Sequence, residues 1–300
     1  MYDVTIFGIH LKLNPVAFTL PFGSGWKIYW YGIIIATGFL LALLYALKNA
    51  PRLNINADKL LDCVLVTTPV SILCARAYYV IFDPATTFAN FFNFSSSGFS
   101  GLAIYGAVIG AFVCGWLMCR IKKLGLRDVF DLTAICFLIG QCIGRWGNFI
   151  NQEAYGSFTG STFWGMQSNV TVNEMGGEGL VHPCFLYESV WCLLGFLLLH
   201  KFSRNRKFSG QIILSYGVWY GFGRGFIELL RTDSLMLGAF RISSLLSFLL
   251  CVGCGITLYI GLKRQKAAVH ESDYGDQFAD ETLSNTAMTD ETENENEYNH

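Results

Sequence analysis

A series of apolar runs, each about as long as a membrane-crossing helix, limits the folds that this chain can adopt. About 20 predominantly apolar residues in a helix cross the hydrocarbon core of a bilayer. The sequence therefore predicts an all-α, polytopic membrane protein with seven transmembrane helices. The runs cover roughly residues 28–48, 60–82, 101–121, 128–147, 183–200, 210–230 and 241–262.

Composition agrees with a membrane protein and argues against an ordinary soluble domain. Hydrophobic residues make up 53% of the chain and charged residues only 14%, whereas soluble domains carry about 25% charged residues. The near-zero net charge hides an asymmetry, because ten of the 22 acidic residues lie in the segment 267–300, which has no Lys or Arg. We expect this acidic segment to be a disordered tail, since it cannot bury a core.

Lys and Arg residues predict the orientation of the chain. The loops 48–59, 120–127, 201–207 and 263–266 hold 14 of them, whereas the alternate loops and the N-terminal segment hold four. Because basic loops stay in the cytoplasm, we expect the N-terminus outside and the C-terminus in the cytoplasm. Residues 1–266 then form one transmembrane domain, in which the long outer loop 147–182 is a small extracytoplasmic head or lid.

The ten cysteines indicate neither a disulfide framework nor a metal site. Nine lie inside apolar runs and Cys184 opens one, so they are expected to act as small hydrophobic residues. Cys251 and Cys254 have C-x-x-C spacing but lack a second pair or His partners. The first residues, MYDVTIFGIH, lack a basic n-region, so no cleavable signal peptide is expected.

Ionisable side chains at membrane depth are costly and usually face a cavity or a partner. The first group of them is GRWGNFINQE at 144–153, which places Arg145, Asn148, Asn151 and Glu153 at the outer end of the fourth span. Arg suits bidentate recognition of phosphate, and the amides and carboxylate suit a hydroxyl-bearing headgroup. The alternative is an Arg that extends to the interface beside a polar helix end.

A second group lies in YGFGRGFIELLRTDS, residues 220–234. Tyr220, Arg224, Glu228 and Arg231 are spaced by four, four and three residues, which predicts that they share one helical face. Such a stripe is hard to explain as packing. The alternative is an Arg224–Glu228 ion pair that only holds helices together, although a pair of this kind can also orient the Arg toward an anion.

Two further segments carry polar side chains near the same face of the membrane. In VHPCFLYE, residues 181–188, His182 precedes Pro183 and is either a ligand-binding residue or a helix-entry residue. In GLAIYGAVIGA, residues 101–111, Gly106 and Gly110 predict tight helix packing, and Tyr105 needs a polar partner in a dry site. Tyr31, in YWYG near the start of the first span, is either functional or part of an aromatic belt.

All these groups start at or near the outer face, and together they predict a protein that handles an anionic lipid headgroup. Two convergent Arg residues, carboxylates, amides and a His are what such a headgroup requires. A transporter without chemistry is the main alternative, since intramembrane Arg–Glu pairs occur there too. Against it, the chain has no inverted repeat and its polar groups gather on one side.

The motif GRWGNFINQEAYG resembles the signature of bacterial prolipoprotein diacylglyceryl transferases, G-R-x-G-N-F-x-N-x-E. The other segments follow in that family's order, from WYG through Arg76, the GLAI segment and HP-x-x-LYE to YG-x-x-R-x-x-x-E-x-x-R. The resemblance covers about Trp30 to Asp233. Each short piece is weak by itself, but the combined pattern is specific.

The resemblance implies a multi-pass enzyme of the bacterial plasma membrane with its active site toward the outer leaflet. The enzyme moves the diacylglyceryl group of phosphatidylglycerol onto the lipobox cysteine thiol of a preprolipoprotein and releases glycerol phosphate, the first step of lipoprotein maturation. The functional residues that it implies are Tyr31, Arg145, Asn148, Glu153, Arg224 and Glu228. Its partners are the lipid, the lipobox signal peptide and the bilayer, with no nucleic acid.

One position departs from the family pattern. Known members carry a His, proposed as the general base, where this chain has Tyr105. Tyr ordinarily has a pKa near 10 and is a poor base at neutral pH. The base is therefore Tyr105 with a pKa lowered by a nearby Arg, or His182, or no protein group, and a catalytically silent relative that keeps the pocket is a further alternative.

The resemblance also suggests how the reaction proceeds. The attacking group is the substrate's thiolate, so none of the chain's own cysteines is required. Charge shifts onto the departing glycerol phosphate, where Arg145 and Arg224 stabilise it. We expect no cofactor and no metal, because the sequence contains neither a phosphate-binding nucleotide loop nor a credible ligand cluster.

Overall fold

Seven long helices dominate the computed structural model, which describes residues 1–21, 26–83, 91, 101–232, 236–237 and 240–268. Their bounds agree with the seven predicted apolar runs to within a few residues, except at the ends of the fourth run and the last one. The helices are α1 Trp30–Asn49, α2 Ala57–Phe82, α3 Ile104–Lys122, α4 Leu126–Asn151, α6 Cys184–Ser203, α7 Gln211–Leu230 and a last helix, Ile242–Ala268. The predicted disorder of the acidic tail falls almost entirely outside the described residues.

Five of these helices are long and apolar enough by themselves to cross a membrane. They are α1 with its 3₁₀ extension η1 (Ala50–Leu53), α2, α3, α6 and Ile242–Ala268. The other two, α4 and α7, are of similar length but carry the polar residues singled out above, including Arg145 and Arg224. The chain is thus mostly helical with at least five candidate spans, and its two polar helices need neighbours to cover them.

The all-α prediction omitted several short strands at one end of the bundle. The strands β1 Tyr2–Ile6, β2 Ile9–Leu13 and β5 Met166–Ser168 form an antiparallel sheet in the order β2-β1-β5. Phe7 and Gly8 connect β1 to β2 with positive φ angles of 48° and 78°, which is the geometry of a tight two-residue hairpin. The loop predicted as a head is therefore only part of it, because the N-terminal strands complete the sheet.

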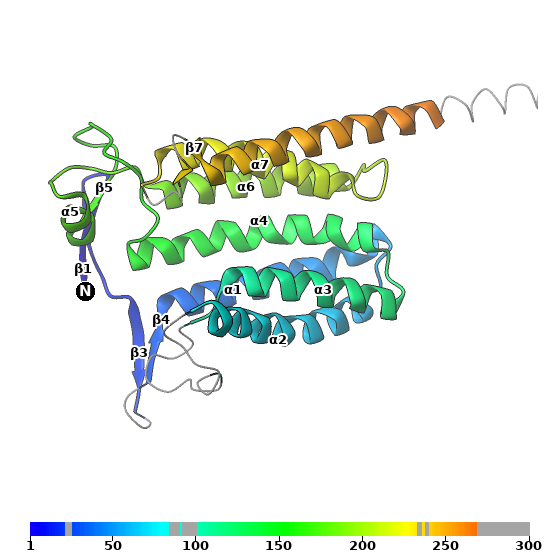
Figure 1. Cartoon of the computed structure of the whole chain (residues 1–300), viewed down its shortest axis with the longest axis horizontal. Helices are drawn as coiled ribbons and strands as arrows, with labels where there is room; N and C mark the ends of the chain where they lie inside the picture. The colour runs from blue at the N-terminus through cyan, green and yellow to red at the C-terminus, as the bar shows by residue number, and fades with distance from the viewer. Residues whose placement is uncertain (22–25, 84–90, 92–100, 233–235, 238–239, 269–300) are drawn as a thin grey trace, which may run out of the picture.

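The remaining secondary structure is brief and lies near the same end. The strands β3 Val16–Leu20 and β4 Trp26–Tyr29 form a hairpin that leads into α1, and β6 Met236–Leu237 pairs with β7 Phe240–Arg241. The short helix α5, Asn169–Met175, follows β5 and begins with a capping box at Ser168 and Thr171. Figure 1 shows β1, β5 and α5 as a separate small body at the left end of the long helices.

The head is joined to the bundle by a shared apolar core. Val4 of β1, Met166 of β5 and Val181 pack with Phe149 from the end of α4 and Phe185 from the start of α6. All five side chains are buried. Because the core includes residues of both parts, the head is fixed to the ends of α4 and α6 and does not hang from a flexible linker.

Small residues bring the helices close together, as the glycine pattern predicted. A Cβ on Gly106 would lie 2.9 Å from Ala75 Cα, and one on Gly110 would lie 2.7 Å from Cys74 Cβ, so α3 packs directly on α2. Cys251 lies within reach of Gly221 on α7 in the same way. All ten cysteines are free thiols, and these contacts show two of them filling helix interfaces.

A buried polar network ties the opposite end of the bundle. Asp131 of α4 is fully buried and accepts hydrogen bonds from the backbone N–H groups of Gly210 and Ile213, at 2.9 Å each. It also pairs with Arg206 at 3.0 Å, and Arg206 reaches Asp128 at 2.7 Å. These bonds satisfy N–H groups at the start of α7 that the helix leaves unpaired and so fix α7 against α4.

Candidate active site

Three helix ends meet at the end of the bundle that carries the head. The C-terminal end of α4, the N-terminal end of α6 and the C-terminal end of α7 all lie there (Figure 1). The predicted site residues Arg145, Arg224 and Glu228 lie near these ends. The bundle therefore brings together segments that are far apart in the sequence.

Glu188 of α6 is the centre of this site. One carboxylate oxygen, Oε2, pairs with Nη2 of Arg145 from α4. The other, Oε1, pairs with Nη1 of Arg224 from α7 and lies 3.8 Å from Nη1 of Arg231. We call Arg145, Glu188, Arg224, Glu228 and Arg231 the guanidinium cluster. It joins three helices through one carboxylate.

The predicted Arg224–Glu228 pair is present within the cluster. Arg224 Nη2 lies 2.6 Å from Glu228 Oε2, one helical turn away on α7. Since Arg224 also pairs with Glu188, the intrahelical pair orients the guanidinium and leaves it able to reach α6. Three guanidiniums and two carboxylates give the cluster a formal net charge of +1, which favours an anionic ligand.

The guanidiniums are more accessible than the carboxylate between them. The side chains of Arg145 and Arg224 are 20% and 17% exposed, whereas that of Glu188 is 5% exposed. Each guanidinium carries five N–H donors. Arg145 uses two of its nitrogens, on Glu188 and at 3.4 Å on Asn148 Oδ1, so donors of both arginines remain available for a ligand.

Paired indole rings fix α6 against α7 beside the cluster. Trp191 Nε1 donates to the carbonyl of Trp219, and Trp219 Nε1 donates to the carbonyl of Trp191, both at 3.0 Å. The rings stack with their centroids 4.2 Å apart. Gly223 admits the Trp191 indole, since a Cβ there would lie 2.5 Å from Trp191 Cε2. This lock sets the register at which Glu188 faces Arg224.

A second lock fixes α4 against α6. Ser189 Oγ donates to the carbonyl of Cys142 at 2.8 Å and accepts from Trp146 Nε1 at 3.2 Å. Ser189 is next to Glu188, and Trp146 is next to Arg145. The contact between Arg145 and Glu188 is therefore held by its immediate neighbours in the sequence.

The other predicted residues of the α4 motif lie around the end of that helix. Asn148 accepts from Arg145, and Asn151 Nδ2 donates to Glu153 Oε1 at 2.5 Å. The helix ends because Gln152 takes a left-handed conformation, and Glu153 is exposed. Tyr31 of α1 packs on Gly147 so closely that a Cβ there would lie 2.7 Å from its ring, which places Tyr31 beside the motif.

The predicted polar stripe on α7 is correct for three of its four members. Tyr220, Arg224 and Glu228 lie on α7, and the Tyr220 ring stacks on that of Tyr216 at 5.5 Å. The prediction that Arg231 continues this helical face is wrong, because α7 ends at Leu230 and Arg231 is extended, bridged to Gly156 of the head. Arg231 nevertheless reaches Glu188 from beyond the helix end.

His182 lies on the head side of the site and not in the guanidinium cluster. Its Nδ1 lies 3.2 Å from the hydroxyl of Tyr187, and that hydroxyl accepts from Trp164 Nε1 at 2.8 Å. The backbone of His182 also pairs with Ser157 and Gly156. These contacts connect the head to the start of α6, in agreement with a helix-entry role.

Tyr105 and Arg76 are not part of the guanidinium cluster. The Tyr105 side chain is 65% exposed at the start of α3, and its ring lies 6.2 Å from that of Tyr78. No hydrogen bond or ion pair links it to Arg145 or Arg224 in the part of the chain that the structure describes. Arg76 is buried and donates to the carbonyls of Phe91 and Gly101, each at 3.1 Å, so it holds the α2–α3 connection.

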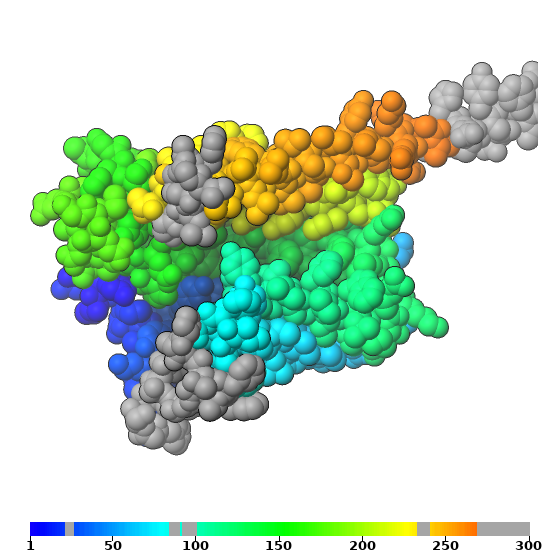
Figure 2. Space-filling view, viewed as in Figure 1, coloured from blue at the N-terminus to red at the C-terminus, as the bar shows by residue number. Residues whose placement is uncertain are grey.

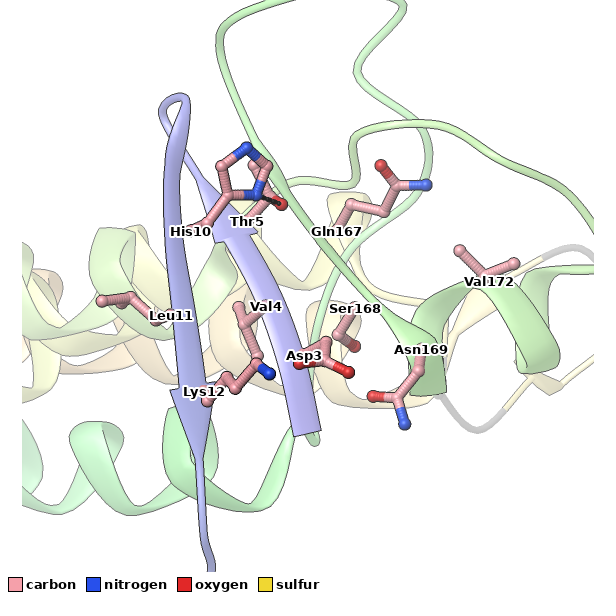
Figure 3. A pocket seen from close by; sticks show the side chains of 10 residues that line it. All are labelled: Asp3, Val4, Thr5, His10, Leu11, Lys12, Gln167, Ser168, Asn169 and Val172. Atoms are coloured by element: carbon pink, nitrogen blue, oxygen red, sulfur yellow. Dashed lines mark hydrogen bonds between the residues drawn. The ribbon is translucent and has the colours of Figure 1, made fainter. Parts of the chain in front are cut away.

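Two hollows lie near or beside this end of the molecule. Figure 2 shows one along the helices, between α3 on one side and the helix Ile242–Ala268 with the yellow-green atoms of α6 and α7 beneath it on the other, with α4 set back between them. The second is a cavity of about 430 Å³ in the head, lined by residues of β1, β2, β5 and α5, including Thr5, His10 and Gln167 (Figure 3). The head cavity contains none of the predicted site residues.

Glu188 of the cluster and the neighbouring Arg241 were not predicted as site residues. Glu188 stood in the segment VHPCFLYE but was not assigned a role, although a Glu one turn inside an apolar helix is itself a signal. Arg241 was counted only as a loop residue, and its Nη1 donates to the carbonyl of Glu228. Nothing in the sequence spacing indicates that contact, because β7 meets α7 only in the folded chain. Among the described residues, no three His, Cys, Asp or Glu side chains gather as a metal site would require.

Comparison with known proteins gives one consistent result. The family model described as prolipoprotein diacylglyceryl transferase matches residues 15–260. A phosphatidylglycerol–prolipoprotein diacylglyceryl transferase of Listeria welshimeri is 42% identical over 267 residues, covering 88% of this chain and 95% of the relative.

Proteins of the same name from Clostridium novyi and Limosilactobacillus reuteri are each 43% identical. They align over 249 and 260 residues, which is 83% and 84% of this chain and 95% and 93% of those relatives. With the family model matching most of its length, this chain belongs to the prolipoprotein diacylglyceryl transferase family.

Proposed function

We propose that this chain transfers the diacylglyceryl group of phosphatidylglycerol to the lipobox cysteine thiol of a preprolipoprotein and releases glycerol phosphate. Its relatives carry the name of that activity. The observation that carries the proposal is the meeting of Arg145 and Arg224, from separate helices, on the two oxygens of Glu188. A site that holds one carboxylate between two guanidiniums has the charge and donor geometry to hold a phosphate.

The proposed setting is the bacterial plasma membrane, crossed seven times, with the N-terminus outside and the C-terminus in the cytoplasm. Residues 1–266 would form the catalytic domain, with the head outside, and 267–300 a disordered acidic tail. The five apolar helices support the membrane setting, and the 14 basic residues in alternate loops support the orientation. With the head outside, the guanidinium cluster lies at the level of the outer leaflet.

The chemical step forms one bond and breaks one. The substrate thiol loses its proton, and the sulfur attacks the glycerol carbon that is bonded to the phosphate ester oxygen. The carbon–oxygen bond breaks, its electron pair goes to the phosphate, and glycerol phosphate leaves with one more negative charge. Since charge grows on the phosphate in the transition state, Arg145 and Arg224 stabilise that state more than the bound lipid.

The neighbouring polar residues are proposed to bind the rest of the headgroup. Asn148, Asn151 and Glu153 offer hydrogen bonds to the glycerol hydroxyls, with Tyr31 beside them. Glu228 and Arg231 balance the charge around Arg224, and Tyr220 lies one turn before Arg224 on α7. His182 orders the head next to the site, and no cofactor is invoked.

The thiol must lose its proton either to a protein side chain or to solvent. Tyr105 is 65% exposed, and among the described residues no hydrogen bond or ion pair links it to the guanidinium cluster. His182 is occupied with Tyr187. We therefore favour a thiol that loses its proton to solvent at the membrane surface before it reaches the lipid carbon. Tyr105 would then line the path that the thiol follows.

The long hollow between α3 and α7 (Figure 2) supports lateral entry of the lipid. A lipid that enters between helices keeps its acyl chains in the bilayer while its headgroup reaches α4. The preprolipoprotein signal peptide is itself an apolar helix and can approach by the same side. α3 and the last helix both carry many exposed large apolar side chains, which suits helices in contact with lipid.

The decisive experiment is transfer of a labelled diacylglyceryl group from phosphatidylglycerol to a lipobox peptide by the purified protein. A sulfur-linked diacylglyceryl product, formed together with glycerol phosphate, supports the proposal. Binding of phosphatidylglycerol without such a product would instead support a transporter or a silent relative. A peptide with Ser in place of the lipobox Cys is the matched control and should remain unmodified.

A further inference from the structure

We infer that Glu188 is an internal competitor of the phosphate, which occupies Arg145 and Arg224 in the empty enzyme and returns to them to expel glycerol phosphate. The inference rests on the proposed function, in which these two guanidiniums bind the phosphate. In this role Glu188 contacts neither substrate and acts only through Arg145 and Arg224. Four observations support it.

First, Glu188 uses both carboxylate oxygens on the residues that the phosphate requires. Oε2 pairs with Arg145 and Oε1 with Arg224, and Oε1 also lies 3.8 Å from Arg231. A phosphate that bridges Arg145 and Arg224 needs the N–H groups that converge between the two arginines, and Glu188 occupies these groups, although each guanidinium keeps further N–H donors for other contacts. The carboxylate and the phosphate therefore compete for the same face of each Arg.

Second, the two partners of Glu188 lie on helices that are locked to its own. Trp191 and Trp219 fix α6 to α7, and Ser189 with Trp146 fixes α4 to α6. The carboxylate thus stays close to both guanidiniums even when it releases them. A tethered group of this kind competes at a high effective concentration.

Third, the net positive charge of the guanidinium cluster would slow release of the anionic product unless a competing carboxylate were present. Without Glu188 the cluster would have three guanidiniums and one carboxylate, a formal net charge of +2 instead of +1. The product carries one more negative charge than the phosphodiester from which it comes. A more positive site would hold this product more tightly and would slow its release, which is the step that limits many enzymes.

Fourth, Glu228 does not have this geometry. It pairs with Arg224 on its own helix at 2.6 Å, and its ion pairs given by the structure do not include Arg145. Glu228 can therefore stay on Arg224 while a phosphate bridges the two helices. Glu188 cannot, because it already forms that bridge.

The test compares Glu188→Gln with the unchanged enzyme and measures product inhibition. The variant keeps the size of the side chain but removes its charge, so glycerol phosphate should bind more tightly. The inhibition constant for glycerol phosphate should fall about tenfold, with KM for phosphatidylglycerol lowered and kcat reduced. Glu178→Gln, the same change at an exposed position in the head, is the matched control and should change none of these values.

A merely structural role for Glu188 predicts the opposite direction. If the carboxylate only holds the arginines in place, its loss disorders them, and both the inhibition constant and KM rise. An unchanged or raised inhibition constant in Glu188→Gln overturns the inference. Should that variant fail to fold, Glu188→Asp keeps the charge but withdraws it by one methylene, and a smaller fall of the inhibition constant is expected; a rise overturns the inference.

Two further variants separate this inference from the proposed function. Arg145→Lys and Arg224→Lys should each weaken inhibition by glycerol phosphate. If both leave the inhibition constant unchanged, the phosphate does not bind there and the proposed function fails. If the two Lys variants raise the inhibition constant for glycerol phosphate and Glu188→Gln raises it as well, the proposed function stands. Only the competitor role of Glu188 is then overturned.

Discussion

Arg145 of α4 and Arg224 of α7 bind opposite oxygens of the same Glu188 carboxylate, although the head segment and the whole of α6 lie between them in the sequence. This relationship explains why α4 and α7 carry charges that an isolated membrane helix would not tolerate. Each guanidinium has a buried carboxylate partner, which offsets the cost of placing it among apolar helices. The same arrangement leaves guanidinium N–H groups for a phosphate.

Removal of either guanidinium should abolish useful turnover. Arg145→Ala and Arg224→Ala each remove a donor that acts on the charge developing on the phosphate, so kcat should fall by at least about 10²–10³. The measurement is single-turnover transfer of labelled diacylglyceryl by folded, purified variants. Arg120→Ala removes an exposed guanidinium at the far end of α3 and should stay near the parent rate. Equal rates for the Arg145 and Arg120 variants would refute the assignment.

A methyl group at Gly147 should displace Tyr31. Because a Cβ there would lie 2.7 Å from the Tyr31 ring, Gly147→Ala moves α1 or the ring at the site and should lower the transfer rate roughly tenfold to a hundredfold. Gly140→Ala is the matched control on the same helix, since nothing lies within 4 Å of its Cβ. That control should be active and, by helix propensity, up to about 1 kcal/mol more stable.

Loss of the Tyr105 hydroxyl should have a small effect. Its side chain is 65% exposed and apart from the guanidinium cluster, so Tyr105→Phe should reduce kcat less than about tenfold, whereas loss of a general base typically costs 10²–10⁴. The check is a rate measurement at several pH values with a saturating peptide. A hundredfold loss, with a changed pH profile, would show that Tyr105 is the base after all.

Asp131 should matter for folding and not for chemistry. It is fully buried, binds Arg206 and accepts two backbone N–H bonds at the start of α7. Asp131→Ala leaves the two backbone N–H groups without this acceptor and leaves Arg206 with Asp128 as its carboxylate partner, and it should cost about 3–5 kcal/mol in the free energy of unfolding. Thermal unfolding in detergent measures this. Asp62→Ala removes the exposed bridge to Lys122 and should leave the unfolding midpoint nearly unchanged, and an equal loss for both variants would contradict the argument.

Much of the helical architecture is readable from the sequence, because hydrophobic run length reports directly on helices that face lipid. The seven apolar runs correspond to the seven long helices, and the polar motif at 144–153 does lie at the end of its helix. The strands of the head were missed for a physical reason. β1 and β2 are short, and β5 pairs with β1 across more than 150 residues, so local periodicity contains no sign of the sheet.

The candidate site was predictable in part, again for a physical reason. Charged residues inside apolar runs stand out individually, so Arg145, Arg224 and Glu228 were found. Their common partner Glu188 was not assigned, since pairing between α4, α6 and α7 depends on the Trp191–Trp219 and Ser189–Trp146 contacts. Arg231 was placed on a helical face by spacing alone, but α7 ends one residue before it.

A double-mutant cycle on Arg145 and Arg224 in the labelled diacylglyceryl transfer assay tests whether the two guanidiniums hold one phosphate between them. Arg145→Lys, Arg224→Lys and the double variant are compared with the parent enzyme. If the two guanidiniums share one phosphate, the double variant should lose at least about tenfold less activity than the product of the single losses, a coupling of about 1.4 kcal/mol. Losses that simply multiply would contradict a shared phosphate site.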